Sequence, residues 1–135
     1  MKTEFLFQSK RFNCTESRDY FLNEGCFGDD VAQWLIEGLR ERTVEVKGEP
    51  QQEDFGWYFR FIVKEVEHCV VILFQPIDPA TGIKWRCWVE CETGFIGSLL
   101  GSRDSGILPE AVSLINSVLT SSPDIQDLVW RERES

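Results

Sequence analysis

The sequence predicts an α+β fold, in which an antiparallel sheet of four to six strands carries two helices packed on one face. Three observations predict this class. Apolar residues recur with helical spacing in two segments, over 30–42 and after Pro109. Between these segments, four consecutive stretches have the alternating or aromatic composition that is typical of strands. No helical pattern separates those stretches, which favours antiparallel pairing with both helices on one side.

The first third of the chain contains a possible strand and the first helix. Residues 4–13 alternate loosely, with Phe5 and Phe7 on one side, and residues 14–28 are expected to be a loop. Asp29 and Asp30 are good N-cap residues for the helix over 30–42. The apolar stripe of this helix consists of Val31, Trp34, Leu35 and Leu39.

The middle of the chain is expected to form an antiparallel meander. Turn signals separate its strands: Gly48-Glu49-Pro50 first, then a polar corner at 65–68, then a segment with two prolines and a glycine over 76–82. The stretch at 69–75 is apolar on both faces and is predicted to be a central strand. The four strands are expected near 43–47, 56–64, 69–75 and 83–91.

The last third is expected to contain a glycine-rich loop over 93–106, the second helix and a short edge strand. Pro109 suits the first turn of that helix, and Ser121-Ser122-Pro123 ends it. Residues 127–131 then have the composition of an edge strand. The apolar stripe of the second helix consists of Leu108, Ala111, Val112, Ile115, Val118 and Leu119.

Composition predicts a single domain over 1–135, located in the cytoplasm. Of the residues 42% are hydrophobic, and ten Phe and five Trp supply enough apolar volume for one core. Five cysteines at irregular spacing indicate reduced thiols, and the N-terminus lacks the apolar run of a secretory signal. The longest apolar run, 69–74, is too short to span a bilayer, so no membrane association is expected.

The charge of the chain argues against nucleic acid as a partner. The formal net charge is −9, with ten acidic and seven basic residues over 1–50, and thirteen and seven over 51–135. A nucleic-acid-binding domain normally has clustered Lys and Arg that neutralise phosphates, and the longest basic group here is Lys10-Arg11. An acidic surface weakly favours a basic protein partner.

Cys87 and Cys91, which flank Trp88, suggest a metal or redox site at first sight. In an extended strand these residues share a face, but four residues at about 3.3 Å each separate them by about 13 Å. Neither zinc ligation nor a disulfide bridges that distance. We therefore expect two small core residues at the interface between sheet and helices, and neither a metal ion nor another cofactor.

Three residues are candidates for a pocket that binds a small molecule or supports an enzyme. Cys26 precedes the first helix, whose N-terminus favours a thiolate, although Glu24, Asp29 and Asp30 oppose it. The single histidine, His68, is expected to be exposed in a turn. Glu53 and Asp54 form a carboxylate pair beside aromatic residues, but neighbours on a strand point to opposite faces. The expected pocket lies at the sheet edge near the loops 14–28 and 93–106.

The face of the sheet away from the helices provides the other candidate site. Alternation places Tyr58 and Arg60, then Val70, Ile72 and Phe74, then Arg86 and Trp88, on the face opposite Trp57 and Trp85. Tyr, Trp and Arg dominate binding hot spots, so Tyr58, Arg60, Arg86 and Trp88 are the protein-binding candidates. Alternatively, the N-terminal segment covers this face with its aromatic residues Phe5, Phe7, Phe12, Tyr20 and Phe21.

Three segments resemble a family of small uncharacterised bacterial proteins. The strand motif is E-D-x-G-W, present here as E-D-F-G-W over 53–57. The helix D-D-V-A-Q-W-L-I-E-G-L over 29–39 and the segment S-S-P-D-I-Q-D-L-V-W over 121–130 accompany it. The resemblance covers most of residues 25–131 and implies a bacterial, cytoplasmic protein. It implies no activity and no functional residue.

Two functions follow as hypotheses. The first is a non-catalytic protein-interaction domain, either self-associating as a homodimer or acting as an immunity or inhibitor protein against a basic toxin. The second is a small-molecule-binding protein or enzyme, with the pocket that contains Cys26, Glu53 and Asp54.

Overall fold

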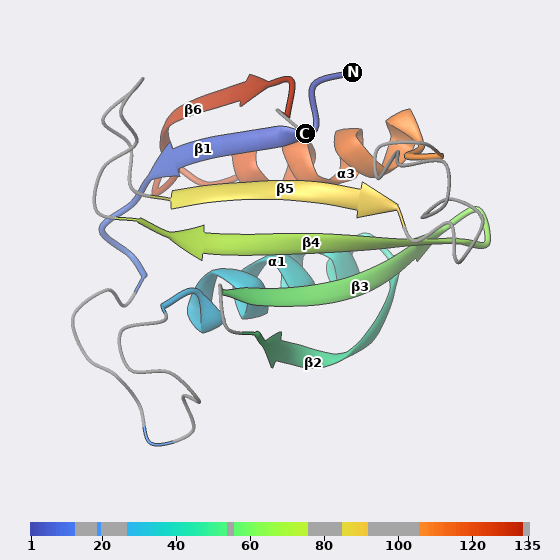
Figure 1. Ribbon diagram of the computed structural model, residues 1–135, viewed down its shortest axis with the longest axis horizontal. Helices are drawn as coiled ribbons and strands as arrows, with labels where there is room; N and C mark the ends of the chain where they lie inside the picture. Colours follow the sequence, from blue (N-terminus) through green and yellow to red (C-terminus); the bar gives the residue numbers. More distant parts are fainter. Residues whose placement is uncertain (13–18, 20–26, 54–55, 76–84, 92–105, 134–135) are drawn as a thin grey trace.

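The computed structural model describes residues 1–12, 19, 27–53, 56–75, 85–91 and 106–133. They form a six-stranded antiparallel sheet and two helices, and both helices lie on one face of the sheet (Figure 1). This confirms the predicted α+β class. The elements are β1 (Glu4–Gln8), α1 (Asp29–Glu41), β2 (Glu45–Gln52), β3 (Trp57–Val63), β4 (Val66–Phe74), β5 (Trp85–Cys91), α3 (Pro109–Thr120) and β6 (Gln126–Arg131).

The first strand lies inside the sheet, where the chain order alone does not place it. The strand order is β2-β3-β4-β5-β1-β6, so β1 pairs with β5 on one side and with β6 on the other (Figure 1). Phe5, Leu6 and Phe7 are all fully buried, as expected for a strand with hydrogen-bonded neighbours on both sides. The C-terminal strand β6 occupies the edge predicted for it.

Helix α1 begins at Asp29, one residue earlier than predicted, and its N-cap is Gly28. Gly28 has a φ of 136°, and a Cβ there would approach Ile72 to 3.0 Å and Trp57 to 3.2 Å. Glycine therefore suits both the backbone conformation and the close contact with the sheet. Asp29 and Asp30 occupy the first helical turn, where their negative charge complements the helix dipole.

Two of the predicted turns are placed differently in the structure. The predicted turn at Gly48-Glu49-Pro50 is wrong, because β2 continues to Gln52 and absorbs these residues as an irregularity in its register with β3. The corner predicted at 65–68 is wrong in extent. Lys64 and Glu65, with φ of 50° and 66°, form a two-residue hairpin that brings Val63 opposite Val66. Strand β4 therefore begins at Val66.

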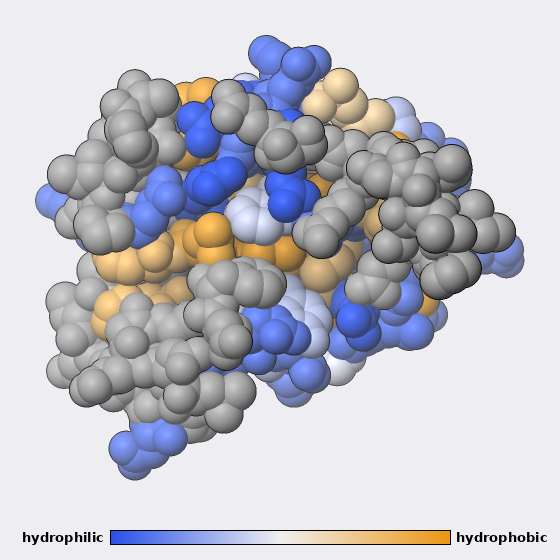
Figure 2. All heavy atoms as spheres, in the orientation of Figure 1, coloured by the Kyte–Doolittle hydropathy of each residue, from blue (hydrophilic) through white to orange (hydrophobic). Residues whose placement is uncertain are grey.

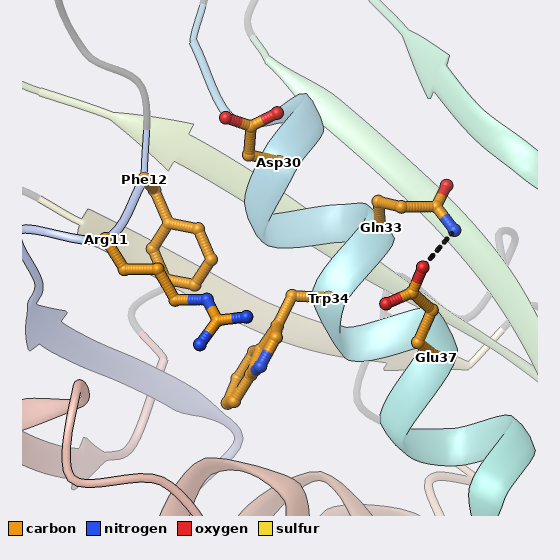
Figure 3. A pocket seen from close by; sticks show the side chains of 6 residues that line it. All are labelled: Arg11, Phe12, Asp30, Gln33, Trp34 and Glu37. Atoms are coloured by element: carbon orange, nitrogen blue, oxygen red, sulfur yellow. Dashed lines mark hydrogen bonds between the residues drawn. The ribbon is translucent and has the colours of Figure 1, made fainter.

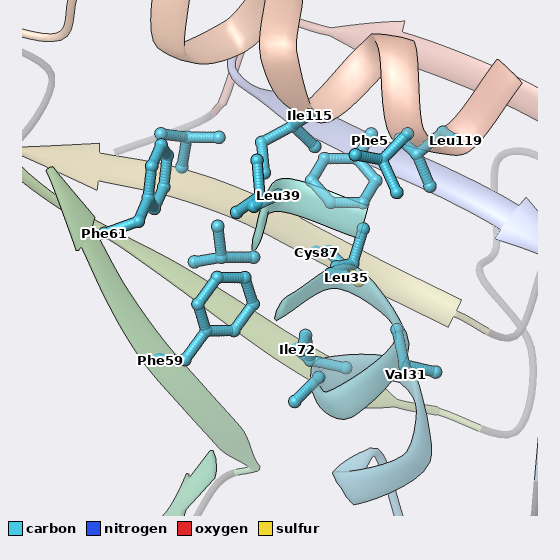
Figure 4. Packing of buried hydrophobic residues seen from close by; sticks show 14 of the residues in the cluster. Phe5, Val31, Leu35, Leu39, Phe59, Phe61, Ile72, Cys87, Ile115 and Leu119 are labelled. Atoms are coloured by element: carbon cyan, nitrogen blue, oxygen red, sulfur yellow. The ribbon is translucent and has the colours of Figure 1, made fainter. Parts of the chain in front are cut away.

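The main core lies between the sheet and the two helices (Figure 4). Leu35 and Leu39 of α1, together with Ile115 and Leu119 of α3, are fully buried against the strands. Cys87 and Cys91 belong to the same core, which confirms that they are small packing residues at the interface between sheet and helices. Burial raises the pKa of the Cys87 thiol far above its usual range, so this thiol stays protonated and unreactive.

Candidate interaction surface

Neither helix covers the second face of the sheet, which carries a transverse row of side chains from five strands. Antiparallel pairing places Tyr58 opposite Val71, Val71 opposite Trp88, Trp88 opposite Glu4, and Glu4 opposite Arg131. Directly opposed residues share a face of the sheet, so this row crosses it from β3 to β6. In Figure 2, a band of hydrophobic atoms crosses the middle of this face, bordered by hydrophilic atoms.

The structure brings the four protein-binding candidates together on this helix-free face. The Arg60 guanidinium lies 5.6 Å from the centre of the Tyr58 ring, and the Arg86 guanidinium lies 5.4 Å from that of Trp88. These are cation–π distances, so each pair is held as a unit. Val71 of β4 lies between the two aromatic residues in the transverse row. The four residues therefore belong to one surface rather than to separate patches.

The apolar centre of this face comes from other β4 residues than predicted. Val70 and Ile72 lie opposite Phe59 and Trp57, and Phe74 packs into the helix-side core, so the predicted placement of these three residues is wrong. The two-residue hairpin pairs Tyr58 with Val71, so the odd-numbered residues of β4, and not the predicted even-numbered ones, share the face of Tyr58. Cys69, Val71 and Trp88 instead form a small buried cluster with the half-buried Tyr58 and Leu73.

The N-terminal segment does not cover this face with the aromatic residues that the structure describes. Phe5, Phe7 and Phe12 all belong to the core on the helix side. Tyr20 and Phe21, the remaining members of the predicted cover, lie outside the described residues. The first strand nevertheless contributes to this face through its other side, because Glu4 and Leu6 alternate with Phe5 and Phe7.

Glu4 is the centre of an ionic network that the sequence analysis did not identify. Its side chain is 2% exposed and accepts hydrogen bonds from Nε of Arg86 and, at 2.7 Å, from Nε of Arg131. Burial raises the pKa of the Glu4 carboxyl, but the hydrogen bonds and charges of the two arginines outweigh burial and lower it overall. Glu4 is therefore a buried carboxylate that fixes two guanidinium groups.

A second carboxylate, Glu90, extends this network to Trp88. The indole Nε1 of Trp88 donates to Glu90 Oε1 at 2.8 Å, and Arg133 donates to the same oxygen at 2.8 Å. The Arg133 guanidinium lies 4.2 Å from the centre of the Trp88 ring. Trp88 thus contacts two guanidinium groups with its ring and a carboxylate with its N–H. We call Glu4, Arg86, Trp88, Glu90, Arg131 and Arg133 the Trp88 cluster.

The residues predicted for a small-molecule pocket are not brought together by the described structure. Cys26 and Asp54 lie outside the described residues. Glu53 is exposed at the turn between β2 and β3, where its N–H donates to Gly56 O at 2.8 Å. Gly56 packs closely against Ile72. The small-molecule and enzyme hypothesis stays a prediction.

Shallow hollows lie beside the first turns of α1 and at the end of β1. One, of about 230 Å³, lies between Arg11, Phe12 and the exposed side of α1, with Trp34 as its aromatic wall (Figure 3). The Arg11 guanidinium lies 6.0 Å from the centre of the Trp34 ring and bridges to Asp124 at 3.0 Å. A larger hollow of about 440 Å³ is lined by Gln8, Ser9, Lys10, Phe12, Phe74, Trp85 and Gln126. Neither hollow contains a predicted pocket residue.

His68 is buried, so the prediction that it is an exposed turn residue is wrong. Because β4 begins at Val66, the His68 ring lies within the sheet and stacks on Phe61 at 5.5 Å between ring centres. The Leu108 N–H donates to Nε2 at 3.2 Å, so the ring proton resides on Nδ1, which donates to Val66 O at 3.0 Å. This neutral ring connects β4 to the N-cap of α3.

Acidification is expected to destabilise the protein through His68. Burial lowers the pKa of this imidazole below 6.5, more than the Val66 hydrogen bond raises it. The unfolded chain therefore binds the proton more tightly, and stability that is complete above about pH 6.5 falls as pH drops through the folded pKa. Urea unfolding at pH 7.5 and 5.0 measures this loss. Since the chain has one histidine, His68→Gln should remove it, and equal wild-type stability at both pH values would contradict a neutral buried ring.

The remaining observations concern metal ions, membranes and related proteins. Within the described ranges, no three His, Cys, Asp or Glu side chains converge in a group that would hold a metal ion. Neither α1 nor α3 has the length and hydropathy that a membrane-spanning helix needs. No protein-family model matches the chain, and no curated protein or solved structure is significantly similar to it. The resemblance to small bacterial proteins therefore stays an expectation.

Proposed function

We propose that this chain is a non-catalytic protein-interaction domain that binds a partner protein with its helix-free sheet face. The observation that carries this proposal is the row Tyr58-Val71-Trp88, with an arginine at cation–π distance from each of its two aromatic residues. A surface with an apolar centre and aromatic and arginine side chains around it has the composition of a binding hot spot. The half-buried Tyr58 and Leu73 retain apolar area that a partner would cover.

Charge favours a different protein over a second copy as the partner. Each copy carries a formal charge of −9, so the association of two copies works against electrostatic repulsion. A basic partner, such as the toxin enzyme of the immunity hypothesis, would be attracted over long range by the same charge. At contact, however, the partner would meet the arginines of the helix-free face.

Site-specific photo-crosslinking tests this function. A benzoylphenylalanine in place of Tyr58 should crosslink one partner protein in cells of the source organism, whereas the same residue in place of the exposed Glu41 on α1 should not. The partner would then be purified, and its affinity measured by calorimetry. Tyr58→Ala and Arg60→Ala are each expected to weaken binding at least about tenfold, as hot-spot truncations do.

Arg40→Ala, at an exposed position of α1, is the matched control for Arg60→Ala and should leave the affinity unchanged. Equal affinities for all variants would exclude this face as the binding surface. A crosslink between two copies, together with a dimer in sedimentation that Tyr58→Ala dissociates, would replace the proposal by self-association.

A further inference from the structure

We propose that Arg86 is a preorganised receptor for a carboxylate of the partner, and that this carboxylate belongs to an acidic residue next to an apolar one. This inference rests on the proposed function, because it names the chemistry that the helix-free face recognises. It depends on three features of Arg86: how its side chain is held, which charges surround it and which side chains flank it.

The Arg86 side chain is held from two directions. Its Nε–H donates to Glu4 Oε1, and its guanidinium carbon lies 5.4 Å from the centre of the Trp88 ring. Among the residues that the structure describes, the two terminal nitrogens of Arg86 donate no hydrogen bond. The side chain is 30% exposed. A guanidinium fixed in this way presents a planar fork that matches the two oxygens of a carboxylate, with little side-chain entropy left to lose.

The carboxylates of the Trp88 cluster already accept hydrogen bonds from its guanidinium groups. Glu4 divides its two oxygens between Arg86 and Arg131. Glu90 receives Arg133. When a partner docks, the two terminal nitrogens of Arg86 lose water, and charged donors that are desolvated without an acceptor are costly. A carboxylate of the partner would accept hydrogen bonds from both of them.

The acidity of the surroundings favours a carboxylate over a phosphate. A phosphate group carries close to two negative charges, whereas a carboxylate carries one. Glu4 and Glu90 lie within the same cluster, and the chain as a whole carries a formal charge of −9, so a dianion meets more repulsion than a monoanion.

The neighbours of Arg86 across the sheet are apolar. Leu73 of β4 lies directly opposite Arg86 on one side, and Leu6 of β1 lies opposite it on the other. Leu73 is half-buried and packs against the small cluster of Cys69, Val71 and Trp88. A ligand residue that reaches Arg86 therefore brings its neighbouring side chain onto Leu73, and an apolar neighbour fits that position.

NMR titration with short peptides tests this inference without knowledge of the partner. The probe is acetyl-Gly-Leu-Glu-Leu-Gly-amide, and the matched peptide contains Gln in place of Glu. The observed signals are Nε–H of Arg86 and the indole N–H of Trp88, assigned with Arg86→Lys and Trp88→Phe. We expect the Glu peptide to shift both signals saturably with a Kd in the millimolar range, as suits one charged contact with a small apolar neighbour. The Gln peptide should bind at least about tenfold more weakly.

Two variants separate the role of Arg86 from general charge. Arg86→Lys keeps the charge but loses the planar fork, so it should weaken Glu-peptide binding about tenfold. Arg40→Ala removes an exposed arginine of α1, outside the helix-free face, and should leave binding by this small peptide unchanged. Equal binding by wild type and Arg86→Lys, no saturable shift with the Glu peptide, or tighter binding of inorganic phosphate at matched ionic strength would each overturn the inference.

The peptide titration and the crosslinking experiment fail independently. If a partner crosslinks at position 58 and its affinity depends on Tyr58, but the Glu peptide does not bind, then the carboxylate inference is wrong and the proposed function stands. If the Glu peptide binds at Arg86 and no partner crosslinks at position 58, then the carboxylate site stands and the proposed function is wrong.

Discussion

Replacing Glu4 by Gln is expected to lower the free energy of unfolding by about 3 kcal/mol. Glu4 is 1% exposed and is the shared acceptor for Arg86 and Arg131. Removal of one partner from a buried ion pair leaves charges without compensation, which typically costs about 3–5 kcal/mol. The lower end of that range is appropriate here, because each of the two arginine side chains is about one-third exposed and can reach water.

Urea denaturation of Glu4→Gln and Glu110→Gln at pH 7 measures this effect against a matched control. Glu110 pairs with Lys64 at 2.8 Å on the surface, with both side chains about half exposed or more, so its loss should be small. The network also predicts a pH window. Since the folded pKa of Glu4 is lowered, its contribution is complete above about pH 4.5 and is lost as pH falls through the folded pKa. Equal stabilities of the two variants would contradict a structural role for Glu4.

The sequence predicted the fold class because its strongest patterns are local. The period of α1 and α3, Pro109 at the start of α3, and the aromatic alternation of β3 each depend on residues close together in the chain. The position of β1 between β5 and β6 depends instead on pairing across more than 80 residues, as between Glu4 and Trp88. The sequence predicted only a possible strand over 4–13, and no local feature of that segment indicates its place in the sheet or its neighbours.

The composition of the helix-free face was predicted only in part, because β4 is apolar on both sides. Alternation identifies the faces of β3 and β5, where Tyr58, Arg60 and Arg86 alternate with buried aromatic residues. In β4, consecutive residues are apolar, so hydropathy does not indicate which side chains lie on which face of the sheet. The two-residue turn at Lys64 and Glu65 decides the register. Neither residue is a glycine or asparagine, so the usual signal for such a turn was missing.

The Trp88 cluster was missed because its members come from three distant parts of the chain. Arg86 and Trp88 were found from their strand, whereas Glu4 and Arg131 join them only through the pairing of β5, β1 and β6. One sequence signal did exist. Glu4 adjoins the uninterrupted apolar run Phe5-Leu6-Phe7, and an acidic residue at the start of a doubly buried strand needs a cationic partner. That signal indicates that Glu4 needs a cationic partner, but it does not identify which residue provides the charge.

Replacing Gly56 by Ala is expected to cost about 3 kcal/mol, because the obstacle to a side chain here is backbone. A Cβ at Gly56 would lie 2.3 Å from the carbonyl oxygen of Ile72, so β3 and β4 must separate locally to admit it. Overpacking that moves backbone costs about 1–3 kcal/mol, and the rigid neighbour places this site at the upper end.

Gly38→Ala is the comparison variant for Gly56→Ala, because a Cβ at Gly38 would meet a side chain rather than backbone. A Cβ at Gly38 would lie 2.5 Å from a methyl group of Val118, where α1 crosses α3. Alanine also gains up to about 1 kcal/mol of helix propensity, so Gly38→Ala should cost only about 1 kcal/mol. Val118→Ala should relieve that cost in a double-mutant cycle measured by urea unfolding.

No side-chain truncation relieves the contact between a Cβ at position 56 and the Ile72 carbonyl, so Leu73→Ala should fail to rescue the stability of Gly56→Ala. Rescue by Leu73→Ala would show that the Leu73 side chain, 2.7 Å from the same Cβ, is the true obstacle.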